Sequence, residues 1–300
     1  MIVVGVDGLP AGVAAAEWAA RESLLRGTAL KIVYVVPAWC LEDGLSGAVA
    51  GIGAWMREGG RSALAEAVHA ARHVAEGIAI DTALLGGDPR RELIEISRQA
   101  DLLVMGGSGL SSLRGLLVGS VTQGVAGHAH CDVVVVRETA PDRRALVVVG
   151  ADASEAQDTV LDFAFAAAAA RGARLRAVLA WNWRVVAANQ TLGEEPEISR
   201  RGLAEALAGR GDRYPEVQVS TEIVEGHPVD VLRHAADRAD LLVVGSHGHG
   251  TLAGMLLGSV SQALLHLAPC PLAVVRVPSR ADDDTGHRDL SRGRGPSRSR

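Results

Sequence analysis

Short motifs occur twice along the 300-residue chain, in the same order and at matching spacing, and this duplication constrains the fold more than any other feature. The matching segments are 3–7 with 148–152, 101–104 with 240–243, 119–121 with 258–260, and 135–137 with 274–276. Each repeat is about 135 residues long, far beyond the ~20–50 residues of solenoid repeats. Each repeat is therefore expected to be a complete domain.

The duplication defines the domain boundaries. The repeats cover residues 1–137 and 145–277, and the segment between them, 138–144, contains Pro141 and serves as a linker. Residues 278–300 lie outside the duplication and consist mainly of Arg, Ser, Asp and Gly. Such a composition cannot bury enough apolar surface to order itself, so we expect a disordered tail.

Within each repeat, short apolar runs alternate with longer segments of helical periodicity. In the first repeat we expect strands near 2–7, 30–36, 78–85, 101–106 and 132–137, and helices near 12–26, 54–76, 89–99 and 119–129. Nearly continuous Val, Leu and Ile are typical of strands that are covered on both faces. Alternating strands and helices with right-handed crossovers predict an α/β fold with a parallel, doubly wound sheet in each of two tandem Rossmann-like domains.

Composition excludes several classes of protein. The net charge of −5 argues against general nucleic-acid binding, and no apolar stretch approaches the ~20 residues that span a bilayer. Three cysteines at irregular spacing indicate a reducing compartment rather than a disulfide framework. The first residues lack the cationic region of a signal peptide. We therefore expect a cytoplasmic protein that binds neither nucleic acid nor membrane.

A glycine-rich segment follows the fourth expected strand of each repeat, at the strand end where doubly wound sheets bind ligands. Glycine allows close approach of the backbone to a ligand, and a helix N-terminus favours phosphate. The two copies consist of Gly106, Gly109, Gly119 and Ser120, and of Gly245, Gly248, Gly258 and Ser259. The same residues would fit a plain turn with a serine cap. Their recurrence at identical spacing favours a phosphate site.

A carboxylate ends the first expected strand of each repeat, at Asp7 and Asp152. At the switch point of strand order it would face the glycine-rich segment, where it suits a ribose hydroxyl or Mg²⁺. A turn or a helix cap is the alternative role. The only lysine, Lys31, lies inside an expected strand, so a Walker phosphate loop is excluded. Without a nucleophile elbow or metal cluster, the sequence predicts a binding module rather than an enzyme, with at most weak ATP hydrolysis.

The pattern Gly-x2-Gly-x9-Gly-Ser, placed after Asp-Leu-Leu-Val, resembles the ATP-binding branch of the universal stress protein family. The opening Val-Gly-Val-Asp-Gly and the Gly-Asp-Pro at 87–89 are similar to that family as well. The resemblance covers residues 1–277 as a tandem pair. It implies that each domain has a five-stranded parallel sheet of order 3-2-1-4-5, with ATP, accompanied by Mg²⁺, between the first and fourth strands.

The resemblance also implies roles for individual residues. Asp7 and Asp152 would contact the ribose or the metal, the two glycine-serine sets would hold the phosphates, and backbone near Val36 and Trp181 would meet adenine. The chain departs from the family pattern at Leu9, where serine is usual. The candidate set is completed by neighbours of these residues, namely Leu110, Val121, His249 and Val260.

Three functions remain open at this point. They are an ATP-binding regulatory protein of the stress response, a slow ATPase, and an interaction scaffold without nucleotide. In the strand order that the resemblance implies, the apolar runs 133–136 and 272–275 fall on sheet edges, where a bare edge invites aggregation. We expect these two strands to pair with each other inside one chain. Whole chains could pair further as homodimers, and the sequence names no protein partner.

Overall fold

The computed structural model describes residues 1–44, 46–107, 118–137, 144–151, 157–181, 196–247 and 257–277. In the helix at 196–211, the side chains are described from residue 200 on. The first domain contains β1 (Ile2–Gly5), β2 (Leu30–Val36), β3 (Ile80–Gly86), β4 (Leu102–Gly106) and β5 (Asp132–Val136). Its helices are α1 (Pro10–Arg26), α2 (Gly47–Val74), α3 (Pro89–Ile96) and α4 (Ser120–His128), with short 3-10 turns at Ala38–Leu41 and Ser97–Gln99.

The second domain repeats this order of elements. Its strands are β6 (Leu146–Ala151), β7 (Arg174–Trp181), β8 (Val219–Glu225), β9 (Leu241–Gly245) and β10 (Leu272–Val275). Its helices are α5 (Gln157–Arg171), α7 (Pro196–Gly211), α8 (Pro228–Ala235) and α9 (Ser259–Leu267).

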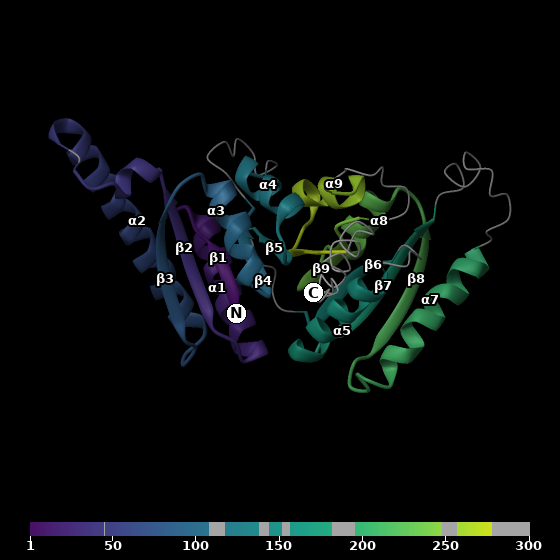
Figure 1. Cartoon of the computed structure of the whole chain (residues 1–300). Coiled ribbons are helices and arrows are strands. Elements are labelled where there is room, and N and C mark those ends of the chain that lie inside the picture. Colours follow the sequence, from purple (N-terminus) through teal and green to yellow (C-terminus); the bar gives the residue numbers. More distant parts are fainter. Residues whose placement is uncertain are drawn as a thin grey trace, which may run out of the picture.

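The described strands form one ten-stranded sheet in the order β3-β2-β1-β4-β5-β10-β9-β6-β7-β8 (Figure 1). Within each domain the neighbouring strands run parallel, in the order 3-2-1-4-5. The structure thus confirms the α/β fold class that the alternation of strands and helices predicts.

The two domains join through β5 and β10, which pair antiparallel. Val135 lies opposite Leu272 and Val133 opposite Val274, and all four side chains are buried. The expected pairing of the last strands is therefore present, and it removes two apolar sheet edges at once.

Helices cover both faces of the sheet. One apolar core combines residues of α1, α2, α5 and α7 with one face, and the other combines α3, α4, α8 and α9 with the opposite face. Each core contains residues of both domains, so it runs without a break across the seam between them. No helix among the residues that the structure describes is long and apolar enough to cross a membrane.

A polar contact ties α1 to α5 at this seam. The carboxylate of Glu22, a buried residue of α1, accepts hydrogen bonds from Arg26 on the same helix and from Arg171 on α5. Each arginine also contacts an aromatic ring of the other domain. Arg26 of α1 lies over the ring of Phe163 in α5, and Arg171 of α5 lies over the ring of Trp18 in α1. The seam therefore combines a shared core with a buried ionic contact.

The largest difference from the expected elements is the start of α2. The helix begins at Gly47 rather than near residue 54. Its first turns carry Val49, Ile52 and Trp55, which are exposed, with Trp55 at 76%. Because this part of the helix extends away from the core, its apolar residues do not follow the pattern of a buried face, and periodicity alone misses it.

Candidate functional site

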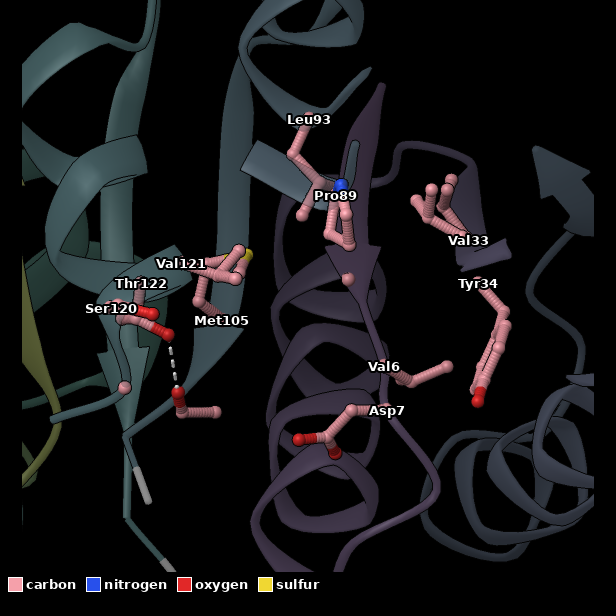
Figure 2. Close-up of a pocket in the computed structure, with 14 residues that line it drawn as sticks. Val6, Asp7, Val33, Tyr34, Pro89, Leu93, Met105, Ser120, Val121 and Thr122 are labelled. Atoms are coloured by element: carbon pink, nitrogen blue, oxygen red, sulfur yellow. Dashed lines mark hydrogen bonds between the residues drawn. The ribbon is translucent and has the colours of Figure 1, made fainter. Parts of the chain in front are cut away.

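A cavity of about 510 Å³ opens at the carboxyl ends of the central strands of the first domain. It lies where β1 pairs with β2 on one side and with β4 on the other, while α1 and α4 lead to opposite faces of the sheet. This is the switch point at which doubly wound sheets bind ligands. Figure 2 shows the lining, which consists of Gly5, Val6, Asp7, Val33, Tyr34, Val35, Pro89, Leu93, Met105, Gly106, Gly119, Ser120, Val121 and Thr122.

One end of the cavity is formed by the N-terminus of α4. Gly119 is the N-cap residue, and Ser120 and Val121 begin the helix, so backbone N–H groups without partners in the helix lie at the lining. The hydroxyl of Thr122 donates to the carbonyl of Gly106 at 2.9 Å, the dashed line in Figure 2. This bond fixes the helix start to the end of β4.

Gly106 has a packing role that the sequence alone does not reveal. A Cβ atom there would lie 2.9 Å from the backbone carbonyl of Ala11, which is closer than real Cβ contacts. The glycine therefore allows β4 to end directly against α1. The second domain shows the same arrangement of helix start and strand end, because the hydroxyl of Ser261 donates to the carbonyl of Gly245.

Asp7 lines the cavity opposite α4. It is exposed, and its Oδ1 accepts a hydrogen bond from the N–H of Leu9 at 3.0 Å, so it does serve the turn between β1 and α1. Figure 2 shows the carboxylate pointing toward the side of the cavity where Ser120 lies. Asp7 is also the only charged residue among the described lining residues. Its turn role and a ligand role are therefore compatible.

The other end of the cavity is apolar and is bounded by β2. The ladder between β1 and β2 ends with the N–H of Val6 donating to the carbonyl of Val33 at 2.9 Å. Peptide groups along a strand alternate between its two neighbours. The next peptide groups that face β1 belong to Val35, but β1 has already turned away toward Pro10. The N–H and C=O of Val35 thus face the cavity.

Strand alternation turns the carbonyls of Val36 and Trp181, which the resemblance places near adenine, away from the switch point. The carbonyl of Val36 accepts from the N–H of Gly87, and that of Trp181 accepts from the N–H of Gly226, each at 2.8 Å. These bonds point toward the outer strands β3 and β8, away from the switch point. Val36 is buried and is absent from the cavity lining. The neighbouring strand that a peptide group faces depends on register, which the sequence does not give.

The structure brings together five of the candidate residues in the lining, namely Asp7, Gly106, Gly119, Ser120 and Val121. In the second domain, Gly245 ends β9, Gly258 is the N-cap of α9, and Ser259 and Val260 begin that helix. The remaining candidates lie outside the described residues, and they are Gly109, Leu110, Asp152, Gly248 and His249.

Several lining residues were not foreseen from the sequence. Tyr34 and Val35 come from β2, Pro89 and Leu93 from α3, and Met105 from β4. Gly-Asp-Pro at 87–89 was the available signal for α3, since Asp88 caps that helix by accepting from the N–H of Arg91. Tyr34, Val35 and Met105 lie in strands, and nothing in the sequence distinguishes them from other strand residues.

The lining of the cavity combines apolar and polar groups. It offers an apolar wall, the peptide edge of Val35, the hydroxyls of Tyr34, Ser120 and Thr122, a helix N-terminus and a single carboxylate. Among the residues that the structure describes, no group of three or more His, Cys, Asp or Glu side chains could hold a metal ion. No nucleophile paired with a base lies in the described lining. The fold and this cavity define a tandem, doubly wound α/β protein with a cavity at the switch point.

The chain belongs to the universal stress protein family. The model of that family matches residues 1–137 and again residues 145–276. Universal stress protein Rv2005c of Mycobacterium tuberculosis is 37% identical over 287 residues, which cover 92% of this chain and 96% of the relative. A universal stress protein of Mycolicibacterium smegmatis is 33% identical over 283 residues, with the same coverage. These relatives match both domains.

A solved structure shows the same fold across both domains. The crystal structure of a universal stress protein from Archaeoglobus fulgidus superposes with a TM-score of 0.68 at 22% identity. It covers 92% of this chain and 97% of the other.

Proposed function

We propose that the first domain binds ATP in the cavity between β1 and β4, and that the chain acts as a nucleotide-dependent regulatory module of the stress response. The observation that carries this proposal is the pairing, within one cavity, of the peptide edge of Val35 with the N-terminus of α4. The cavity volume of about 510 Å³ falls in the range of ~300–1,000 Å³ that is usual for small-molecule sites.

The adenine end of this proposal depends on Val35. Adenine carries an amino donor beside a ring nitrogen acceptor, which match the C=O and N–H of one peptide edge. Guanine reverses this order of donor and acceptor, so it would set an oxygen against a carbonyl and leave polar groups unpaired. The apolar side chains of Val33, Leu93 and Met105 supply the surface for the faces of the base.

The phosphate end depends on α4. Helix N–H groups and the helix dipole favour negative charge at Gly119 and Ser120. The carboxylate of Asp7 and the hydroxyl of Ser120 are oxygen ligands of the kind that Mg²⁺ takes together with phosphates. The donor set therefore suits Mg²⁺–ATP. By the duplication, the second domain would use Gly258 and Ser259 in the same way.

We propose binding without efficient hydrolysis. Asp7 is the only ionised group in the described lining that could activate water, and it already accepts a bond from Leu9. We expect a turnover far below the ~10 s⁻¹ of a typical enzyme. The three cysteines form no disulfide, which supports a reducing, cytoplasmic setting as part of this proposal.

Titration calorimetry with paired variants tests the proposal. Ser120→Glu places a carboxylate where phosphate would bind, yet negative charge at a helix N-terminus is favourable for folding. Ser120→Gln is the uncharged control of the same length. We expect the parent to prefer ATP over GTP, Ser120→Glu to lose the first site, and Ser120→Gln, which removes the hydroxyl without adding charge, to weaken the first site much less. No ATP binding by the parent, or full binding by Ser120→Glu, would overturn the proposal.

A further inference from the structure

The helix α9 of the second domain reaches the candidate ATP site of the first domain. The N–H of Val118 donates to Nδ1 of His266, in the last turn of α9, at 3.4 Å. Val118 directly precedes Gly119 and Ser120, which line the cavity. The side chain of Val118 is buried in the same apolar core as Leu264 of α9. A backbone N–H in such a place needs a partner, and the other domain supplies it.

A second contact fixes the position of His266. The guanidinium of Arg137, just after β5, donates to the carbonyl of Leu265 at 3.0 Å and to that of His266. These carbonyls belong to the C-terminal turn of α9, where C=O groups have no partners within the helix and the helix dipole favours a cation. The stem of Arg137 packs against Gly107, where a Cβ atom would lie 3.1 Å from its Cγ. The C-terminal end of α9 is thus attached to the first domain at two places, Val118 and Arg137.

Among the residues that the structure describes, the second domain shows no corresponding contact. By the repeat, Leu257 occupies the place of Val118, and Gly127 occupies the place of His266. Glycine has no side chain that could accept a hydrogen bond from Leu257. The seam therefore supports the two candidate sites unequally.

We propose that His266 is a positioning residue of the first candidate site: by accepting from Val118, it holds the segment that presents the N-terminus of α4 to phosphate. This inference rests on the proposed function for its ligand, ATP. Its chemistry is simple, because Nδ1 acts as a hydrogen-bond acceptor and no covalent step takes place. The first site is then completed by a histidine of the other domain, and the described residues show no such contact at the second site.

Calorimetry on the full-length chain separates the two sites. Ser259→Glu closes the second site at the opposite end of α9 from His266, and Ser120→Glu closes the first. In the Ser259→Glu background we expect His266→Ala to weaken ATP binding about fivefold, the loss of one hydrogen bond, and His266→Asn to restore most of it because Oδ1 can accept from Val118. In the Ser120→Glu background we expect His266→Ala to change nothing.

Two further measurements complete the test. His234→Ala is the matched control: His234 lies on α8, and its Nδ1 lies 2.6 Å from the carbonyl oxygen of Asp230 on the same helix, so this change should leave both sites unchanged. Amide exchange measured by NMR without ligand should be faster at Val118 in His266→Ala and unaltered at Leu257.

The outcomes distinguish this inference from the proposed function. Equal weakening of both sites by His266→Ala, no weakening, or no recovery with His266→Asn would overturn the positioning role. An unchanged exchange rate at Val118 in His266→Ala would overturn the contact itself. If neither background binds ATP, the proposed function fails, and the exchange rates still decide whether His266 holds Val118.

Discussion

Replacing Glu22 by alanine measures how much the ionic contact at the seam stabilises the fold. Glu22 is 1% exposed, and its Oε1 lies 2.6 Å from Nε of Arg26 while its Oε2 accepts from Arg171. Without the carboxylate, two guanidinium groups face each other across the seam. Removing one partner of a buried ion pair costs about 3–5 kcal/mol. Since Arg26 is 31% exposed and can turn toward water, we expect the lower end, about 3 kcal/mol.

Urea unfolding followed by circular dichroism gives this free energy, and Glu17→Ala is the matched control. Glu17 lies on the same helix and pairs with Arg21 at 3.3 Å, but both side chains are about one-third exposed. Such a pair contributes about 0.3–0.5 kcal/mol. The expected shift of the urea midpoint for Glu22→Ala is about 1 M at a slope near 3 kcal/mol/M. Equal costs for the two variants would refute the view that burial makes the seam contact strong.

Three other predictions follow from burial and from the duplication. Burial raises the pKa of the Cys131 and Cys270 thiols from 9.0 to about 12. In the unfolded chain these thiols are exposed and ionise at a lower pH than in the folded protein, so raising the pH favours the unfolded state. The free energy of unfolding should therefore fall as pH rises from 9.0 toward 12, by about 1.4 kcal/mol per pH unit for each thiol. Urea titrations of the variant with both cysteines replaced by alanine should lack this extra dependence of the free energy of unfolding on pH. An unchanged pH dependence in that variant would contradict the role given to the two thiols. Val135→Lys buries a charge opposite Leu272 and should abolish cooperative unfolding or cause aggregation, whereas Val219→Lys, on the outer strand β8, should change stability by less than about 0.5 kcal/mol. Truncation before residue 278 should leave both the melting temperature and ATP binding unchanged, and a clear drop in either would show that the tail contributes.

Much of the fold could be predicted because the duplication and the strand pattern agree. The apolar runs at 133–136 and 272–275 predicted a covered edge, and the structure pairs them. Strand 30–36 was predicted to the residue, since it is bounded by Gly27 and Pro37. The expected first strand, 2–7, was too long because Val6 and Asp7 already belong to the turn toward α1.

The candidate site could be predicted only in part. Glycines, Ser120 and Asp7 are visible in sequence because their types are unusual beside apolar strands. Val35 is not, because the face of a strand that a peptide group points to depends on register with its neighbours. The contacts of Glu22 with Arg171 and of His266 with Val118 were not predicted either. They join residues more than a hundred positions apart, and their meeting depends on how the two domains pair.

A crystal structure of the chain with a non-hydrolysable ATP analogue and Mg²⁺ would test the central claim most directly. We expect the amino group of adenine to donate to the carbonyl of Val35, and the phosphates to lie at the N-terminus of α4 beside Ser120, with Asp7 on the ribose or the metal. Density for the analogue away from both candidate sites, or a base that contacts Val36 rather than Val35 in the first domain, would contradict the account.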